Sequence, residues 1–144
     1  MSTPSVRDAL EKLAKVFAGQ PHKARSKNPA ATAVFENGLK FQVTGPSSLA
    51  SCNATVIAMR AAQVGVTLTS LEVSVSSESD TRGLLGTDDS VSAGLFDLRT
   101  HVKIGAKDAT ADQLQEIVQW ADAHSPVGCT IRRSPTNAVE IEVL

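Results

Sequence analysis

One stretch of the chain is almost free of charge, and this feature constrains the fold more than any other. Between Phe41 and Leu71, the only charged residue is Arg60. The segment Ser47–Val64 has few helix-breaking residues and ends at Gly65, so we predict a helix there. Its apolar residues fall on two faces: Leu49, Cys52, Val56 and Met59 on one, and Ala50, Ala54, Ile57, Ala61 and Val64 on the other. Such a helix is buried on most sides, so we expect the sheet or a second subunit to cover it.

Two further segments are predicted to be helices. Residues 1–19 carry an apolar stripe at helical spacing, with Thr3 as N-cap and Pro4 at the first helical position. Thr110 and Gln113 form a capping-box pattern, which predicts a helix that ends at His124-Ser-Pro126. Residues 20–30 contain proline, serine and several cations, and we expect a solvated connector there.

Strands are predicted where apolar and polar residues alternate or β-prone residues flank a turn. Asn37-Gly38 is the preferred pair for a two-residue hairpin turn, and residues 80–94 indicate a loop. The predicted strands are Ala31–Glu36, Leu39–Val43, Leu71–Ser76, Phe96–Ile104 and, closing the chain, Val139–Val143. The order of elements lacks the rhythm of a doubly wound fold. We therefore predict an α+β fold with a largely antiparallel sheet.

The composition excludes several classes of function. A chain of 144 residues predicts one domain spanning 1–144, and its net charge of −1 offers no attraction for nucleic acid. No apolar run spans a bilayer, and the N-terminus lacks the layout of a signal peptide, so we expect a cytoplasmic protein without a membrane partner. The histidines at 22, 101 and 124 show no ligand spacing, so we predict neither a metal nor another cofactor.

The two cysteines are the residues best suited to chemistry. Cys52 lies about one turn inside the predicted helix, where the helix N-terminus favours a thiolate, although burial opposes it. Cys129 follows the His124-Ser-Pro126 stop and is too distant in sequence for a CxxC motif. We expect Cys52 to be the more reactive thiol. The alternative is that it packs as a small apolar side chain.

Three features in this order resemble the OsmC/Ohr superfamily, the osmotically inducible and organic hydroperoxide resistance proteins. They are the cysteine-bearing segment Pro46–Val56, the strand pattern from Arg82-Gly83 into residues 95–104, and the helix end Trp120–Val127. The resemblance covers the chain from about Ala31 onward. It implies an α+β fold with mainly antiparallel curved sheets around a buried central helix. It also implies an intertwined homodimer with the active site near the dimer interface.

The resemblance also implies roles for individual residues. In peroxidase members, a first cysteine attacks the peroxide O–O bond, and a second cysteine condenses with the resulting sulfenic acid. Cys52 matches the first cysteine, whereas Ser125 stands where peroxidase members carry the second, and a hydroxyl cannot form a disulfide. Cys129 is the candidate resolver, or an external thiol regenerates Cys52. The family's glutamate before the nucleophile helix is missing, and Arg25 is the nearest candidate for its thiolate-binding arginine.

Three interpretations follow. The first is a thiol peroxidase that reduces organic hydroperoxides through Cys52 and needs a thiol reductant. The second is a non-catalytic, stress-related dimer that binds a small apolar molecule in the interface pocket, and the third is a protein whose Cys52 is merely packed. We favour the first, while enzymatic activity itself stays open. If the chain descends from the peroxidase design, Ser125 points toward Cys52.

Overall fold

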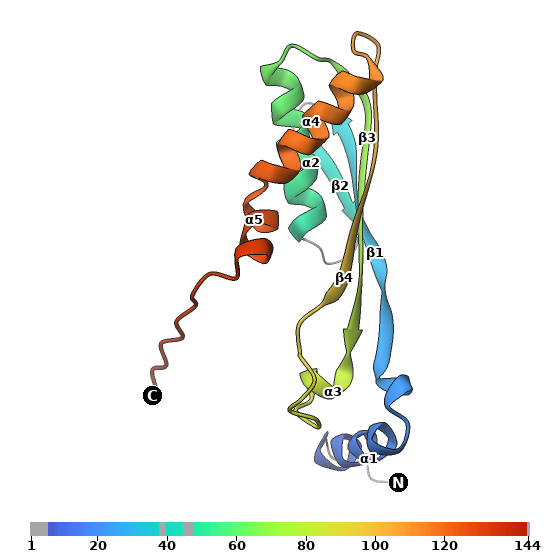
Figure 1. Ribbon diagram of the computed structural model, residues 1–144, viewed down its shortest axis with the longest axis vertical. Helices are drawn as coiled ribbons and strands as arrows, with labels where there is room; N and C mark the ends of the chain where they lie inside the picture. The colour runs from blue at the N-terminus through green and yellow to red at the C-terminus, as the bar shows by residue number, and fades with distance from the viewer. Residues whose placement is uncertain (1–5, 38–39, 45–47, 144) are drawn as a thin grey trace. The chain divides into compact units, whose positions relative to one another are not determined.

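The chain folds into helices and strands that confirm the predicted α+β class (Figure 1). A computed structural model describes residues 6–37, 40–44 and 48–143. The elements in chain order are α1 (Val6–Gly19), the 3₁₀ helix η1 (Pro21–Ala24), β1 (Arg25–Asn37), β2 (Lys40–Thr44), α2 (Ser48–Gln63), β3 (Leu68–Asp80), α3 (Thr81–Leu84), β4 (Phe96–Ala106), α4 (Ala111–His124) and α5 (Pro126–Arg133).

The described strands form one four-stranded sheet with the order β2-β1-β3-β4. The hairpin is confirmed, because β1 and β2 pair antiparallel with Ala33 opposite Val43. Of the predicted turn pair Asn37-Gly38, Asn37 is the last residue of β1, and Gly38 lies outside the described residues. In Figure 1, β3 runs opposite to both of its neighbours, as the predicted antiparallel sheet requires.

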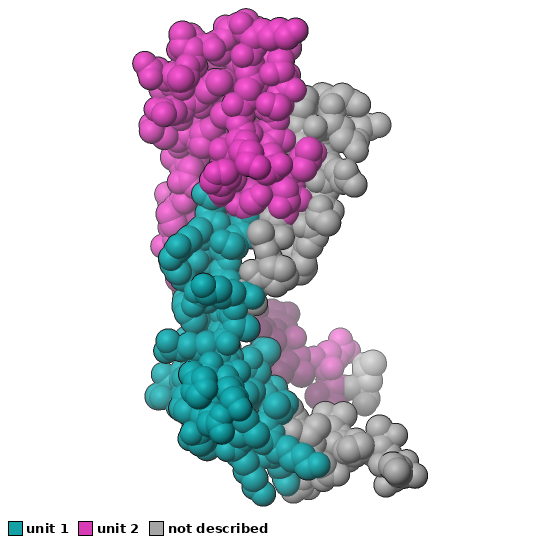
Figure 2. Space-filling view, turned by 90° about the vertical axis from the view of Figure 1, so that its right-hand side faces the viewer, with its two compact units in different colours: residues 1–30, 75–100 teal, residues 31–74, 101–144 magenta. Residues whose placement is uncertain are grey.

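The residues divide into two compact units, which Figure 2 distinguishes by colour: residues 1–30 with 75–100, and residues 31–74 with 101–144. Strands β1, β3 and β4 each contribute residues to both units. The first unit contains α1, η1 and α3, and Phe17, Ala24 and Val75 are buried in it. The single domain expected over residues 1–144 stays a prediction.

Helices α2, α4 and α5 contact one another in the second unit, and α2 also contacts β2. The small side chains of α2 let these neighbours approach closely, since alanine adds little volume between helix axes. The buried apolar residues of this unit are Ala33, Ala50, Ala54, Ile57, Ala58, Ala61, Leu71, Val73, Ile117 and Ala121. This core fixes the first turns of α2 beside α5.

The predicted central helix is confirmed as α2, and its two apolar faces differ in burial. The face with Ala54 and Ile57 is buried, except that Val64 at its end is 46% exposed. On the other face, Cys52 and Val56 are half-buried and Met59 is 46% exposed. One chain therefore buries most of one apolar face of the helix and covers the other face only in part.

The helix predicted after Thr110 and the strand predicted from Phe96 are both confirmed. In α4, Thr110 and Gln113 make both hydrogen bonds of the predicted capping box. The strand predicted over Phe96–Ile104 is β4, which extends to Ala106. Val102 and Ile104 are half-buried, but Phe96 near its start is exposed. Of the helix predicted over residues 1–19, the structure describes α1, and its expected cap at Thr3 lies outside the described residues.

The predicted connector over residues 20–30 is wrong. Pro21–Ala24 form the 3₁₀ helix η1, and β1 already begins at Arg25. The strand forms despite its polar sequence because its backbone pairs with β3, and the hydroxyls of Ser26 and Ser79 lie 3.1 Å apart across the two strands. Polar side chains are typical of a loop, but they are equally compatible with the exposed face of a strand.

The predicted loop over residues 80–94 contains a short helix, α3, at its start. Asp80 caps this helix by accepting a hydrogen bond from the backbone N–H of Arg82. Gly83 is required in it, because a Cβ atom there would overlap the backbone carbonyl of Ser92. The remainder of the segment has no helix or strand, as expected.

Helix α5 is absent from the elements that the sequence predicts, because His124-Ser-Pro126 indicates only the end of a helix. Ser125 ends α4 and also caps α5, whose first residue is Pro126. Proline is well suited to that position, since its missing N–H would have no partner in the first turn. Ser134 ends α5 with a left-handed backbone at φ 44°.

The predicted closing strand over Val139–Val143 is wrong for the single chain. Residues 134–143 form neither helix nor strand, and Val139, Ile141 and Val143 are 77%, 81% and 89% exposed. Alternation predicts a strand only if a neighbouring strand accepts its hydrogen bonds and a core accepts its apolar face. The described residues of this chain offer neither to the segment.

Candidate functional site

Cys52 lies in the second turn of α2, and its sulfur contacts a polar side chain. Its Sγ atom is 3.3 Å from the Oγ atom of Ser125. The expected approach of Ser125 to Cys52 is therefore confirmed, although the two residues are 73 positions apart in sequence. Cys52 is half-buried, so part of its surface is open to solvent or to a reactant.

Ser125 is fully buried between α4 and α5 and has two polar contacts. Its Oγ atom accepts a hydrogen bond from the backbone N–H of Gly128, at 3.3 Å. Since this contact uses a lone pair, the hydroxyl proton stays free to point at the Cys52 sulfur. The pair can therefore place an O–H donor on an anionic sulfur without breaking another contact.

The local sequence explains why these two side chains meet. Ser125 lies at the junction of α4 and α5. Its position is fixed because it is the N-cap of α5, whose first residue is Pro126. Figure 1 shows α5 beside the end of α2 where Cys52 lies, and α2 and α5 are in contact. The arrangement does not depend on a loop that could take several conformations.

Cys129 occupies a different environment, one turn into α5. Its thiol donates a hydrogen bond to the carbonyl oxygen of Ala123, at 3.2 Å. An Nη atom of Arg132 lies 3.7 Å from the same sulfur, and this guanidinium also pairs with Asp122. The pKa of Arg132 is raised above its ordinary value, first by the hydrogen bond to Cys129 and further by the charge of Asp122. Both cysteines are free.

Asn53, the residue after Cys52, is not among the candidates that the sequence suggests. Its side chain is 4% exposed, and its Oδ1 atom has no hydrogen-bond partner among the described residues. A buried amide oxygen without a hydrogen-bond partner lowers the free energy of unfolding by about 1–3 kcal/mol, so native proteins contain few of them. Its place in a helix that the sequence predicts to be buried on most sides is the signal that could draw attention to it.

Arg25, the sequence candidate for a thiolate-binding arginine, lies in the first unit and contacts a carboxylate there. Its Nε atom is 3.7 Å from Asp80, whose main partner is Arg82 at 2.8 Å. The hydrogen bond from Arg82 holds the pKa of the Asp80 carboxyl below its usual value, and Arg25 adds a smaller effect of the same sign. Asp80 and Arg82 thus form an ion pair where β3 ends and α3 begins.

Neither a metal site nor a membrane segment is evident in the part of the chain that the structure describes. Within it, no three His, Cys, Asp or Glu side chains gather closely enough to hold a metal ion. No helix there is both long and apolar enough to cross a membrane.

Comparison with known proteins identifies the family. The sequence pattern that describes OsmC-like proteins matches residues 46–140, more than half of the chain. Among solved structures, the fold is similar to that of an OsmC-like hydroperoxide resistance protein from Jannaschia sp. CCS1, with a TM-score of 0.60 and 14% sequence identity. That match covers 83% of this chain and 95% of the other. None of the curated proteins matches. The resemblance predicted from the sequence is confirmed, and the chain belongs to the OsmC-like protein family.

Proposed function

We propose that this protein reduces hydroperoxides, with Cys52 as the attacking thiol. The observation that carries the proposal is the 3.3 Å contact between the Cys52 sulfur and the Ser125 hydroxyl, in a half-buried site near the start of α2. A thiolate is the nucleophile in such chemistry, and both a nearby helix N-terminus and an O–H donor stabilise it. Membership in the OsmC-like family and the hydroperoxide resistance neighbour support the choice of peroxide as substrate.

The first step transfers two electrons from sulfur to the peroxide. The Cys52 thiolate attacks one peroxide oxygen, an S–O bond forms, and the O–O bond breaks. The leaving alkoxide takes a proton and departs as an alcohol, and Cys52 becomes a sulfenic acid. The Ser125 hydroxyl, at hydrogen-bond distance from the sulfur, holds the thiolate before the attack. It acts as a positioning group and is not consumed.

The second step needs a reductant, which we take to be a small dithiol. One of its thiols condenses with the sulfenic acid to give a mixed disulfide and water. Its second thiol then attacks that disulfide and releases Cys52 as a thiol. Ser125 cannot replace a resolving cysteine in this step. Cys129 is a poor resolver, because its thiol is engaged with the Ala123 carbonyl.

A homodimer completes this proposal. Val56, which is half-buried, and Met59, which is exposed, belong to an apolar face of α2 that the single chain covers only in part. Burying such a face returns about 25 cal/mol for each Å² removed from water. A second copy of the chain would supply the cover that the sequence pattern predicts. Light scattering after size exclusion should therefore give twice the mass of 15.1 kDa at micromolar protein.

A second candidate function rests on a different observation. An open cavity of about 390 Å³ lies between β4 and α4 and is lined by Val102, Ile104, Leu114 and Val118 among others. Apolar cavities of this size accept small organic molecules. A non-catalytic protein that binds such a molecule would keep this cavity and have no use for Cys52.

The experiment that separates the two candidates follows peroxide consumption by the purified protein. Cumene hydroperoxide and hydrogen peroxide are offered in turn, with dithiothreitol as reductant. We expect consumption by the wild type, loss to the uncatalysed background in Cys52→Ser, and retained consumption in Cys129→Ser. If the Cys52→Ser variant consumes peroxide as fast as the wild type, the peroxidase proposal fails and the apolar-ligand function gains.

A further inference from the structure

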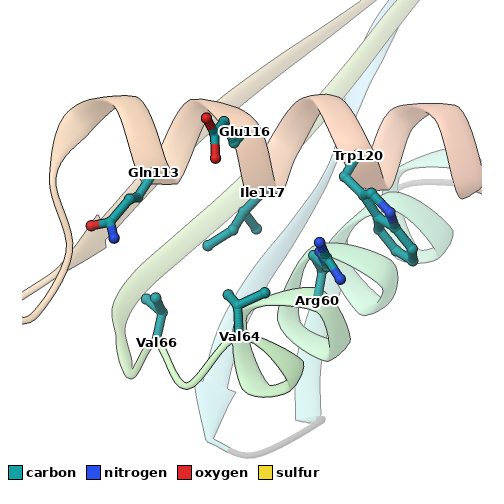
Figure 3. A pocket seen from close by; sticks show the side chains of 7 residues that line it. All are labelled: Arg60, Val64, Val66, Gln113, Glu116, Ile117 and Trp120. Atoms are coloured by element: carbon teal, nitrogen blue, oxygen red, sulfur yellow. The ribbon is translucent and has the colours of Figure 1, made fainter.

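A second cavity, of about 310 Å³, lies at the far end of α2 from Cys52 (Figure 3). One wall is the last turn of α2 with the connection to β3, and the other is α4. Arg60 stands eight residues after Cys52, which is roughly 12 Å along a helix axis. Nothing in the proposed peroxide chemistry uses this cavity, so an inference about it is independent of that function.

Arg60 presents an unpaired cation to the cavity. It is the only charge between Phe41 and Leu71, and its guanidinium carbon lies 4.5 Å from the centroid of the Trp120 ring. No described carboxylate lies within ion-pair distance of it. The contact with the ring face orients the guanidinium while leaving its N–H groups available as donors. A half-buried arginine of this kind is suited to bind a carboxylate.

Trp120 itself is held firmly, which makes it a fixed wall. Its ring stacks on that of His124, with centroids 3.9 Å apart and planes inclined by 8°. His124 is in turn fixed by a contact of 2.7 Å between its Nδ1 atom and the carbonyl oxygen of Trp120. Both residues lie on α4, one turn apart. The aromatic wall and the cation over it therefore form one preorganised end of the cavity.

The opposite sign of charge comes from α4. Glu116 lines the cavity and has no ion-pair partner among the described residues, and it lies beyond ion-pair distance of Arg60. Figure 3 shows Gln113 at the other end of the cavity from Trp120. The side-chain oxygen of Gln113 accepts from the backbone N–H of Thr110, which leaves its NH₂ group as a donor. Two opposite charges thus border one cavity without neutralising each other.

Between these charges the lining is apolar. Val64 and Val66 lie on one side, and Ile117, which is almost fully buried, lies on the other. A simple carboxylate would be repelled by Glu116, and a simple amine by Arg60. A molecule with a negative group, a positive group and an apolar group could pair with Arg60 and Glu116 and pack against the apolar lining at the same time.

We propose that this cavity binds a small α-amino acid with an apolar side chain. The ligand's carboxylate pairs with Arg60, its ammonium group pairs with Glu116, and its side chain packs against Val64 and Ile117. The volume is at the lower end of the range for small-molecule sites, which fits a ligand of this size.

The test uses Trp120, which is the only tryptophan in the chain and lies in the cavity wall. L-Leucine is titrated into the intact protein while tryptophan emission is recorded. 4-Methylpentanoate and isoamylamine, which each lack one of the two charges, are titrated in the same way. We expect a saturable change with leucine, and binding at least about tenfold weaker with either analogue.

Variants then test each charge by calorimetry, because replacing Arg60 alters the emission of Trp120 directly. Arg60→Gln and Glu116→Gln should each weaken leucine binding by about tenfold or more. Arg99→Gln removes an exposed cation that pairs with Asp97, and it should bind leucine as the wild type does. The proposal is overturned if leucine gives no saturable signal, if the analogues bind equally well, or if the Arg60 and Glu116 variants bind unchanged.

Discussion

Cys52 and Cys129 belong to the same packed unit, yet the sulfur atoms of the two residues contact different kinds of groups. Cys52 meets a hydroxyl, which can donate a proton toward an anionic sulfur. Cys129 donates a hydrogen bond to the carbonyl of Ala123, which can only accept and so offers no donor to an anionic sulfur. Arg132 beside Cys129 acts in the other direction, since a guanidinium attracts an anionic sulfur.

This contrast shows that a cysteine's place on a helix does not by itself decide its chemistry. Both residues lie within the first turns of a helix, Cys52 on α2 and Cys129 on α5. What differs is the partner of the sulfur: one neutral donor in the first case, and an acceptor with a cation in the second. The predictions below separate these partners, in order of decreasing effect.

The largest effect is expected from Ser125→Cys. The serine oxygen is 3.3 Å from the Cys52 sulfur, and a disulfide of about 2.05 Å needs only a small further approach. In a background with Cys129→Ser, peroxide should convert most of the variant to a disulfide between Cys52 and the introduced cysteine. Non-reducing mass analysis detects it as a loss of two hydrogens. Formation of a Cys52–Cys129 disulfide in the wild type would instead assign the resolver's role to Cys129.

Removal of the hydroxyl by Ser125→Ala should have the next largest effect. It takes the donor from Cys52 and the cap from α5, so we expect the peroxide reaction of Cys52 to slow about tenfold. We also expect a loss of about 1 kcal/mol in the free energy of unfolding. The rate is read by mass spectrometry of Cys52 after timed peroxide exposure, and the stability by denaturant unfolding.

Thr130→Ala is the matched control, because it removes a hydroxyl from the same helix whose hydrogen bond goes to the Pro126 carbonyl and not to Cys52. It should leave the Cys52 rate unchanged. An equal slowing in both variants would mean that Ser125 acts only by holding α5 in place.

A smaller effect is expected from Arg132→Gln. Loss of the guanidinium removes the attraction for an anionic sulfur at Cys129, so its alkylation by iodoacetamide should slow by about threefold, as for exposed charge pairs. The rate at Cys52 should not change. Arg133→Gln, which removes the neighbouring cation instead, serves as the control. If both variants leave Cys129 unaltered, Arg132 has no influence on its reactivity.

The smallest effect is expected from salt alone. An exposed attraction between Arg132 and the Cys129 sulfur is screened when the ionic strength rises to about 1 M, where the Debye length is about 3 Å. Alkylation of Cys129 should then slow by less than the Arg132→Gln substitution causes, while Cys52, whose partner is neutral, keeps its rate. A salt effect confined to Cys52 would contradict this assignment of partners.

The sequence predicted those elements whose signals are local. The capping box of Thr110 and Gln113 is a contact between near neighbours, so its residues alone predict the start of α4. The segment with Arg60 as its only charge predicted α2 for a similar reason. Val139–Val143 has an equally clear strand pattern and forms no strand, because a strand depends on a partner that sequence alternation does not supply.

The candidate site was predictable only in part. Cys52 and Ser125 were paired through the family resemblance, since no spacing rule brings residues 73 positions apart together. Arg132 at Cys129, the unpaired oxygen of Asn53 and the stacking of Arg60 on Trp120 depend on how α2, α4 and α5 pack. In the sequence each of these residues stands alone, without a pattern that predicts which residue it contacts.

The central claim, that Cys52 is the thiol that reacts with peroxide, is tested most directly by trapping its first product. Wild-type protein is treated with one equivalent of cumene hydroperoxide in the presence of dimedone, which reacts with sulfenic acids, and the modified peptide is identified by mass spectrometry. Our account predicts a dimedone adduct on Cys52 and little on Cys129. An adduct on Cys129 alone, or none on either cysteine while peroxide is still consumed, would contradict it.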